Sequence, residues 1–419
     1  MKKLKIQGGH TLSGEISISG SKNAALSVIA ASIMTKEKVV LENIPHLEDI
    51  TTMIRLIAGM GVSVTLADNS KLILDSSKIR NFLAPYDLVK TMRASILVLG
   101  PLVARFGEAT VSLPGGCAIG ARPVNMHLDG LKAMGAEIEI NEGYICAKAK
   151  KLKGAHFSFK PVSVTGTANL MMAAVLAEGQ SILENSSIEP EVISLGELLL
   201  KMGAKIKGLG TRKIIIDGVN TLASAEHTII PDRIEAGTFL VAATITKSSV
   251  TLKKTQPEHL QSVLDLLNHS GALISLEEDK IELNMKEKNI IPVDFTTNPY
   301  PGIPTDMQAQ FMILNAIARG NSIVNETIFE NRFMHVLELQ RMGADISLSG
   351  NTAYITGVKR LQAAPVMATD LRASAALVLA GLVADGETHI DRIYHIDRGY
   401  ECIENKLSLL GAKVARIET

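Results

Sequence analysis

Hydrophobic and polar positions along this 419-residue chain follow a unit that is repeated six times. Each copy contains a glycine, usually followed by alanine, and then a strand-like alternation of polar and apolar residues. The six glycines lie 68 to 74 residues apart, at Gly61, Gly135, Gly203, Gly271, Gly343 and Gly411. A nearly fixed period of this length indicates one supersecondary unit that has been copied.

Each unit begins with an apolar stretch rich in alanine, leucine and methionine, which predicts a helix. These stretches are Ala24–Met34, Ala94–Ala104, Ala168–Ala177, Ala236–Thr246, Ala309–Ala318 and Ala373–Ala384. A β-branched run follows, such as Lys38–Leu41 or Ser249–Leu252. A second helix, such as Val192–Met202 or Phe333–Met342, then ends at the repeated glycine. We expect this glycine to adopt the left-handed conformation that terminates many helices.

Five copies end in further strand-like segments, which the sixth copy lacks because the chain stops at Thr419. These segments are Lys71–Lys90, Tyr144–Thr165, Lys213–Pro231, Lys280–Thr305 and Ala353–Thr369. The missing pattern occurs at the opposite end of the chain, in Leu4–Ser19, so we predict that the N-terminal segment completes the sixth copy.

The predicted permutation divides the chain into two lobes of three repeats each. Residues 20–230 form one lobe, and residues 1–19 together with 231–419 form a second, discontinuous lobe. The chain then crosses twice between the lobes, near Gly20 and near Ile230, which predicts a hinge and a cleft. The alternative is one long array with a disordered N-terminus. Arrays normally end in polar capping units, and the sequence has none, which favours two lobes.

Composition changes this picture little. The chain is 46% hydrophobic and 21% charged, as in ordinary globular proteins. Lys plus Arg and Asp plus Glu both number 43, so no net charge attracts nucleic acid or an anionic membrane. The apolar runs are shorter than the roughly 20 residues that a membrane span needs. The N-terminus lacks the apolar region of a signal peptide, and we expect a cytoplasmic protein.

Candidate functional residues lie just before the first helix of each copy, at positions where the copies differ. Lys22, Arg93 and Arg372 add positive charge where free backbone N–H groups already favour phosphate and carboxylate ligands. Asp306 and Asp370 occupy the corresponding place in their copies. Aspartate at such a position is commonly a helix N-cap, so these two residues can be either caps or functional groups.

The second copy also carries a glycine-rich loop, Leu113–Pro123, that contains Cys117 and Arg122. Positive charge nearby lowers the pKa of a thiol and favours the thiolate, so Cys117 is either a reactive cysteine or an inert one. We expect Cys146 and Cys402 to be inert core residues. Three cysteines without a CxxC spacing argue against a disulfide framework or a zinc site, and no other metal cluster is evident.

The unusual positions together supply one lysine and five arginines: Lys22, Arg93, Arg122, Arg332, Arg372 and Arg398. If these cations converge, the ligand is small and polyanionic, because arginine binds phosphate and carboxylate through two parallel hydrogen bonds. The alternative is that several of them are solvated surface charges.

Five strings in order make the chain resemble the enolpyruvyl transferases over its full length. They are Gly20–Ala25, Gly115–Val124, Pro304–Gln310, Glu330–Phe333 and Asp397–Tyr400. The resemblance implies an α/β fold known as a six-repeat inside-out barrel, with two three-repeat lobes that have helices inside and sheets outside. It also implies transfer of the enolpyruvyl group of phosphoenolpyruvate to the 3′-hydroxyl of UDP-N-acetylglucosamine, releasing phosphate, which is the first committed step of bacterial peptidoglycan synthesis.

The resemblance further implies roles for individual residues and no metal, cofactor or required protein partner. Cys117 is the acid that protonates the enol methylene, and Asp306 is the base and a sugar contact. Lys22, Arg122 and Arg398 hold phosphoenolpyruvate, supported by the other three arginines, Arg93, Arg332 and Arg372. Asn23 contacts the sugar. The residues implied to line the nucleotide are Arg122, Pro123, Val124, Asn125, Met126, Pro161, Val162, Ser163, Val164 and Ile328.

Three residues depart from the pattern expected of this family: Asn125 replaces an aspartate, Pro161 a lysine and Thr165 a glycine. All three lie in the implied nucleotide region. The nearest rival activity uses shikimate 3-phosphate as the acceptor, but Asn23 and the cysteine loop argue against it. A catalytically silent UDP-sugar sensor and an RNA-end-processing enzyme are further alternatives. The complete set of acid, base and cations argues against the first, and zero net charge against the second.

Overall fold

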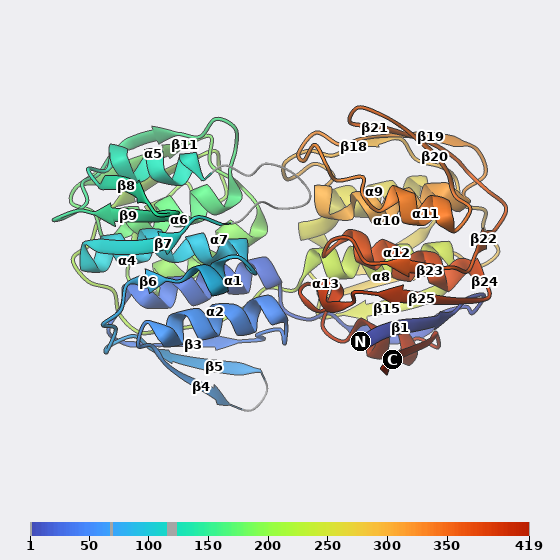
Figure 1. The fold of residues 1–419 in the computed structure, drawn as a ribbon, viewed down its shortest axis with the longest axis horizontal. Helices are drawn as coiled ribbons and strands as arrows, with labels where there is room; N and C mark the ends of the chain where they lie inside the picture. The colour runs from blue at the N-terminus through green and yellow to red at the C-terminus, as the bar shows by residue number, and fades with distance from the viewer. Residues whose placement is uncertain (1, 68–69, 115–123, 419) are drawn as a thin grey trace. The chain divides into compact units, whose positions relative to one another are not determined.

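The computed structural model describes residues 2–67, 70–114 and 124–418. The described residues divide into two compact units. We call residues 20–114 and 124–230 the continuous unit, and residues 2–19 and 231–418 the discontinuous unit. In Figure 1 the continuous unit carries the labels α1, α2 and α4 to α7, and the discontinuous unit carries α8 to α13 together with both chain termini.

The continuous unit contains three four-stranded sheets within its described residues. Their orders are β14-β3-β5-β4, β6-β7-β9-β8 and β10-β11-β13-β12. In each sheet three antiparallel strands come from one repeat, and a fourth, parallel strand comes from the preceding repeat. The parallel pairs are β6 with β7, β10 with β11 and β14 with β3. The last pair joins the third repeat to the first, so the strand exchange closes into a ring.

The elements of the continuous unit have the following bounds: α1 Lys22–Ala31, η1 Ser32–Met34, β3 Lys38–Glu42, α2 Glu48–Gly59, β4 Ser63–Ala67, β5 Lys71–Asp75, β6 Leu83–Ala84, α3 Tyr86–Val89, η2 Arg93–Val98, α4 Leu99–Phe106, β7 Glu108–Ser112, α5 Asn125–Ala133, β8 Glu137–Asn141, β9 Tyr144–Lys148, β10 His156–Ser158, α6 Val164–Val175, β11 Gln180–Glu184, α7 Pro190–Lys201, β12 Lys205–Lys207, β13 Lys213–Asp217 and β14 Ala225–Thr228.

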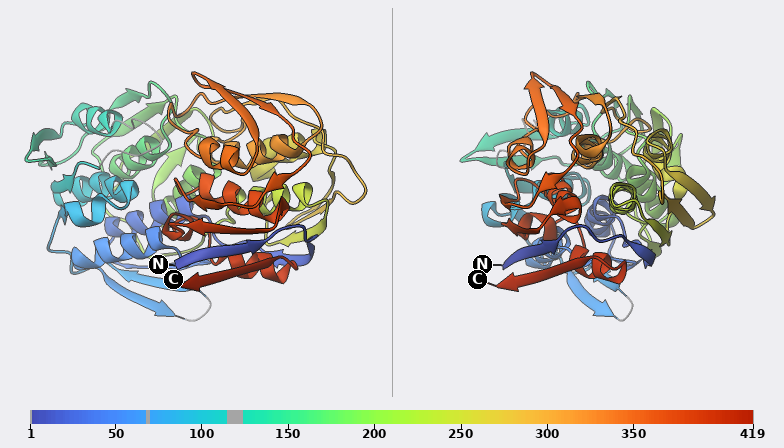
Figure 2. Two further views of the ribbon diagram at one scale, coloured as in Figure 1. Left: turned by 45° about the vertical axis from the view of Figure 1, so that its right-hand side comes forward. Right: turned by 90° about the vertical axis from the view of Figure 1, so that its right-hand side faces the viewer.

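The discontinuous unit repeats this arrangement and uses the N-terminus to complete it. Its four-stranded sheets are β16-β17-β15-β2, β18-β19-β21-β20 and β23-β25-β1-β26, and β22 pairs with β24. Strand β1 lies between β25 and β26, with Leu4 opposite Ile390 and Arg416. Strand β2 runs parallel to β15 and closes the ring. The prediction that the N-terminal segment completes the sixth copy is therefore confirmed, and Figure 2 shows the first and last strands side by side.

The elements of the discontinuous unit have the following bounds: β1 Lys2–Gln7, β2 Ser13–Ser17, α8 Arg233–Ile245, β15 Ser249–Lys253, η3 Pro257–Leu260, α9 Gln261–His269, β16 Leu273–Glu277, β17 Lys280–Asn284, β18 Phe295–Thr296, η4 Thr305–Met307, α10 Gln308–Ile317, β19 Asn321–Asn325, α11 Val336–Arg341, β20 Asp345–Ser349, β21 Thr352–Thr356, β22 Leu361–Gln362, β23 Pro365–Met367, α12 Ala373–Val383, β24 Ala384–Asp385, β25 Glu387–Asp391, α13 Tyr394–Asp397, α14 Ile403–Leu409 and β26 Lys413–Glu418.

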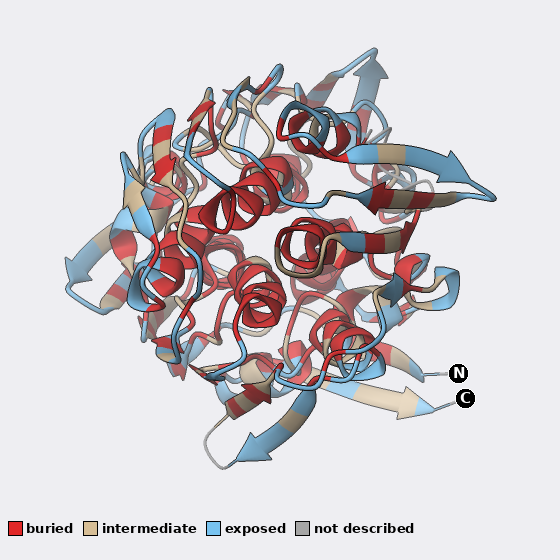
Figure 3. Cartoon of the chain, turned by 90° about the vertical axis from the view of Figure 1, so that its left-hand side faces the viewer, coloured by how far each residue is buried: buried red, intermediate tan, exposed pale blue. Residues whose placement is uncertain are grey.

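The first helix of each repeat lies inside its unit and the sheets lie outside. Helices α6, α8 and α12 are buried along most of their length, because small and apolar residues occupy every side of them. The strands alternate instead, with buried residues on one face only. Figure 3 shows this distribution, with buried residues concentrated in the helices and exposed residues along the outer strands. The predicted inside-out α/β fold is thus confirmed.

The predicted helix Ala94–Ala104 is interrupted for a reason visible in the structure. The side-chain amide of Asn169 enters its hydrogen-bond ladder, donating to the Ile96 carbonyl and accepting from the Gly100 N–H. Pro101, which has no N–H, follows directly. The segment is therefore a 3-10 helix, η2, that continues as α4. A polar side chain inserted into the ladder is a recognised cause of such a break.

Three other expectations about local structure are corrected. Helix α6 begins at Val164 rather than Ala168, because Ser163 caps it by accepting from the Gly166 N–H. Helix α11 begins at Val336 rather than Phe333, because the Val336 N–H bonds three residues back and forms a turn. Cys402 is exposed rather than a core residue. Partial burial of its thiol and the carboxylate of Glu404 raise the pKa of Cys402, which disfavours the thiolate.

All six repeated glycines have positive φ angles, between 88° and 107°. The predicted left-handed helix ends are therefore confirmed. A side chain added to Gly135 would meet nothing within 4 Å, whereas one added to Gly61 would lie 2.7 Å from the Lys78 carbonyl oxygen.

These two glycines provide a matched test of the repeat. Gly135→Ala should lower the free energy of unfolding by about 1–2 kcal/mol, the cost of a left-handed conformation for a residue with a side chain. Gly61→Ala should cost more, because the backbone must also move away from the Lys78 carbonyl. Urea denaturation of both variants measures the difference, and equal costs would contradict the steric argument.

Candidate functional site

Two arginines of the discontinuous unit hold the carboxylate of Asp306. This aspartate lies in η4, immediately before α10. One oxygen of Asp306 lies 2.7 Å from Arg332 Nη2, and the other lies 3.5 Å from Arg372 Nε. The arginines are buried, whereas the Asp306 side chain keeps 27% of its surface exposed. The two arginines therefore favour the carboxylate form of Asp306, and its exposed part remains accessible to a ligand.

Arg372 is fixed in several directions at once. Its Nη1 donates to the Gly399 carbonyl over 3.1 Å, and its Nη2 lies 3.5 Å from Asp232. The guanidinium carbon lies 5.1 Å from the centre of the Tyr400 ring. Burial by itself would lower the pKa of Arg372, but the carboxylates of Asp232 and Asp306 outweigh burial and raise it. Arg372 is consequently a permanent, rigidly oriented cation.

Asp306 and Asp370, which the sequence left as either helix caps or functional groups, have different roles. Asp306 lies inside η4, whose N-cap is Pro304, so the N-cap interpretation is wrong for Asp306. Asp370 does act as a cap, because its Oδ1 accepts from the backbone N–H groups of Arg372 and Ala373 at the start of α12. Sequence position alone did not separate these two cases.

Arg398 follows α13 and is partly buried. Burial lowers the pKa of His395, and the positive charge of Arg398 lowers it further, so the two side chains are electrostatically coupled. The next residues anchor this segment. Gly399 accepts from Arg372, and the buried Tyr400 hydroxyl lies 2.9 Å from Thr238 Oγ1.

In the continuous unit, Lys22 and Asn23 are the first two residues of α1. The helix therefore begins two residues before the predicted Ala24, and Ser21 caps it through the Ala24 N–H. Lys22 is 91% buried, and its Nζ lies 3.5 Å from Asp49 at the start of α2. The interpretation of Lys22 as a solvated surface charge is therefore wrong.

Arg93 begins η2, and its charge acts on the buried His127. Burial lowers the pKa of His127 to about 4, with a further contribution from Arg93, so the imidazole is neutral at neutral pH. His127 Nδ1 lies 2.8 Å from the amide nitrogen of Asn169, and Nε2 lies 3.3 Å from Thr165 Oγ1. Because the amide nitrogen donates, Nε2 carries the imidazole proton.

The residues implied to line a nucleotide lie at two helix starts. Val124, Asn125 and Met126 open α5, and the four residues from Pro161 to Val164 lead into α6. The contact between His127 and Thr165 holds these two helix starts together. Val124, the N-cap of α5, makes no side-chain capping bond among the described residues. N–H groups at a helix start favour anionic groups such as phosphate.

Of the remaining predicted residues, Ile328 lies in the described part of the chain and three others do not. Ile328 is partly buried, and its backbone N–H donates to Glu326 over 2.8 Å. Cys117, Arg122 and Pro123 lie outside the described residues.

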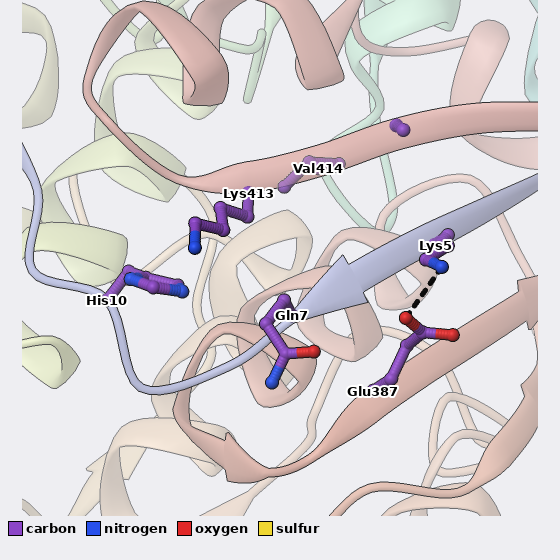
Figure 4. A pocket seen from close by; sticks show the side chains of 7 residues that line it. Lys5, Gln7, His10, Glu387, Lys413 and Val414 are labelled. Atoms are coloured by element: carbon purple, nitrogen blue, oxygen red, sulfur yellow. Dashed lines mark ion pairs between the residues drawn. The ribbon is translucent and has the colours of Figure 1, made fainter.

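Two surface pockets in the described part of the chain lie away from this site. One is lined by Lys5, Gln7, His10, Glu387, Lys413 and neighbouring residues of the sheet that contains β1 and β26, and it includes no predicted site residue (Figure 4). Glu387 pairs with Lys5 over 2.7 Å there. Within the described ranges, no cluster of three metal-ligating side chains occurs, and no helix is long and apolar enough to cross a membrane.

Sequence reasoning missed several neighbours of the predicted residues. Asp49 faces Lys22, and Glu326 binds the Ile328 backbone. Asp232, at the equivalent helix start of the fourth repeat, both caps α8 and faces Arg372. The one available signal was its equivalence to Asp306 and Asp370 in the repeat.

Residues 6–407 match the family described as EPSP synthase (3-phosphoshikimate 1-carboxyvinyltransferase). The chain is 58% identical over 417 residues to a UDP-N-acetylglucosamine 1-carboxyvinyltransferase from Halorhodospira halophila, covering 100% of both chains. The fold is similar to that of the enolpyruvyl transferase NikO from Streptomyces tendae, with a TM-score of 0.90, 24% identity and coverage of 100% and 99%. It is also similar to an EPSP synthase from Acinetobacter baumannii, with a TM-score of 0.76, 18% identity and full coverage of both chains.

Proposed function

The chain belongs to the EPSP synthase family of enolpyruvyl transferases, and from this membership we propose that it transfers the enolpyruvyl group of phosphoenolpyruvate to UDP-N-acetylglucosamine. The observation that carries the choice of acceptor is 58% identity, over the whole chain, to a relative named for that reaction. The structures related at 18–24% identity support the fold alone and do not decide between acceptors.

The proposed reaction is an addition followed by an elimination. The 3′-hydroxyl oxygen of the sugar bonds to C2 of phosphoenolpyruvate as C3 gains a proton, which forms a tetrahedral intermediate. Loss of phosphate from C2 and of a proton from C3 then restores the double bond. The chemistry needs a base near the hydroxyl, an acid near C3 and cations for the phosphate and carboxylate.

We assign these roles to individual residues of the chain. Asp306 accepts the hydroxyl proton, which is consistent with an ionised, partly exposed carboxylate. Cys117 protonates C3. Lys22, Arg122 and Arg398 hold phosphoenolpyruvate, with support from Arg93, Arg332 and Arg372. Asn23 contacts the sugar, and the starts of α5 and α6, together with Ile328, line the nucleotide.

The departures in the nucleotide region bear on affinity. Asn125 and Pro161 supply no charge where the family pattern expects an aspartate and a lysine. Thr165, which replaces a glycine, contacts His127. If the nucleotide is held mainly by backbone groups of the helix starts, these replacements leave binding intact.

We further propose that the enzyme acts in the cytoplasm, in peptidoglycan synthesis and hence in cell-wall growth and division. The proposed chemistry is complete with side chains alone, so it requires no metal, cofactor or protein partner.

Phosphate release provides the direct test. Phosphoenolpyruvate together with UDP-N-acetylglucosamine should release phosphate, whereas phosphoenolpyruvate with shikimate 3-phosphate should release none above the background without an acceptor. Release only with shikimate 3-phosphate, or with neither acceptor, would overturn the proposed function. Mass analysis of the nucleotide product should show the added enolpyruvyl group.

A further inference from the structure

Glu326 is a buried carboxylate that no sequence pattern singled out. It follows β19 directly and is 2% exposed. Its Oε1 accepts three hydrogen bonds: from Thr297 Oγ1 at 2.9 Å, from the Ile328 N–H at 2.8 Å and from the Phe329 N–H at 3.1 Å. One oxygen of Glu326 therefore fixes the turn that carries Ile328.

The other oxygen of Glu326, Oε2, faces Thr305 and, beyond it, Arg332. Oε2 lies 2.9 Å from Thr305 Oγ1, and the same hydroxyl oxygen lies 2.9 Å from Arg332 Nη1. A guanidinium nitrogen can only donate, so the threonine oxygen accepts from Arg332. The single hydroxyl proton must then be donated to Glu326, which fixes the direction of both hydrogen bonds.

This chain of contacts ends at Asp306. While Nη1 of Arg332 binds Thr305, its Nη2 donates to Asp306 over 2.7 Å. The guanidinium is planar and its donors are held in a fixed fork, so fixing one nitrogen fixes the direction of the other. The orientation of Arg332 against Asp306 thus depends on Thr305, and the acceptor state of Thr305 depends on Glu326.

Hydrogen bonds, and no ion pair, satisfy the buried Glu326 side chain in the described part of the chain. Among the described residues, no cation forms an ion pair with it, and burying a carboxylate without such a pair is costly. Its partners are two hydroxyl groups and two backbone N–H groups. All four partners donate, so both oxygens of the Glu326 carboxylate act as acceptors, and the Thr305 contact depends on Oε2 accepting.

We propose that Glu326 and Thr305 form a relay that positions Arg332 against Asp306 and, through the turn at Ile328, aligns the acceptor side of the site. Glu326 is a positioning residue, since it acts through Thr305 and Arg332. This inference rests on the proposed function, because it takes Asp306 and Ile328 as the residues that meet the UDP-sugar.

Two replacements disrupt the relay at different points. Glu326→Gln preserves Oε1 and its three donors but places an NH₂ group opposite Thr305, so the hydroxyl proton loses its acceptor. Thr305→Val preserves the shape of the side chain and removes the hydroxyl. Thr305→Ser retains the hydroxyl. Thr352→Val is the matched control, because it removes a 2.8 Å hydrogen bond to Asn325, the residue next to Glu326, without touching the relay.

The expected result is a change in steady-state constants for the UDP-sugar. A misplacement of about 1 Å at a reacting group can cost roughly 100-fold in rate. Glu326→Gln and Thr305→Val should therefore lower kcat by roughly 10- to 100-fold and raise KM for UDP-N-acetylglucosamine more than KM for phosphoenolpyruvate. The double variant should be no worse than the poorer single variant, because both break one relay. Thr305→Ser and Thr352→Val should stay close to the unmodified enzyme.

The outcomes separate this inference from the proposed function. No phosphate release by the unmodified enzyme would mean that the proposed function fails. An active unmodified enzyme with unchanged constants in both relay variants would overturn the relay. Loss of kcat with both KM values unchanged, in proportion to a lower folded fraction, would also overturn it and leave a structural role. If Glu326→Gln fails to fold, the Thr305→Val and Thr305→Ser pair carries the same test.

Discussion

Replacement of Asp306 by asparagine should lower turnover by about 10²- to 10⁴-fold, the range expected when a positioned acid–base group is removed. The amide cannot accept a proton from the sugar hydroxyl. Its oxygen can still accept from Arg332, as Asp306 Oδ1 does over 2.7 Å. Arg372 keeps Asp232 and the Gly399 carbonyl as partners, so the variant should remain folded. The measurement is phosphate release at saturating concentrations of both substrates.

A matched control separates this effect from the loss of any aspartate–arginine pair. Asp385 and Arg360 form an exposed pair at 3.2 Å, in which both side chains keep more than half of their surface. Asp385→Asn should leave turnover within about twofold, because exposed pairs contribute little. If Asp306→Asn retained turnover within tenfold of the unmodified enzyme while remaining folded, Asp306 would not be the base.

The repeat allowed the sequence to predict the ring architecture, including the place of the N-terminal strands. Strand exchange depends on which segments have strand character and where a copy lacks one. Both are properties of the local pattern, as Leu4–Ser19 illustrates. The contacts that close the ring are those of β1 between β25 and β26 and of β2 beside β15. They follow because Leu4–Ser19 supplies the strands that the sixth copy lacks.

The side-chain partners at the site could not be predicted in the same way. Asp306 and Asp370 stand at equivalent places in the repeat, yet one is held by two arginines and the other caps a helix. The difference depends on Arg332, 26 residues from Asp306 along the chain. A local pattern gives the face on which a residue lies, but not the long-range partner that it meets there.

The interruption of the helix that begins near Arg93 illustrates the same limit. The segment Ala94–Ala104 is apolar and helical in pattern, and Pro101 was the only local sign of a break. The residue that enters the ladder is Asn169, about 70 residues later. Its amide also contacts His127, so a single buried side chain connects the start of α4 to the start of α5.

Arg372 should have the largest effect on stability among the predicted site residues. Arg372→Met removes the cation that faces the buried carboxylate of Asp232 and one side of Asp306. Breaking a buried pair by deleting one partner typically costs about 3–5 kcal/mol, since the remaining charge is left without compensation. We expect a loss of that size in the free energy of unfolding, together with loss of turnover. Arg372→Lys should restore the charge but not the activity, because one ammonium cannot reproduce the contacts to Gly399, Asp232 and Asp306.

A double variant tests whether the uncompensated charge is the cause. Asp232→Asn removes the charge but keeps an oxygen that can cap α8 through the Ile234 and Glu235 N–H groups. If the unpaired carboxylate accounts for the loss, the combined variant Asp232→Asn with Arg372→Met should be more stable than Arg372→Met alone. Urea denaturation of the two single variants and the double variant measures the coupling. Strictly additive losses would show that Arg372 stabilises the unit through its packing on Tyr400 and its bond to Gly399, rather than through the buried charge pair.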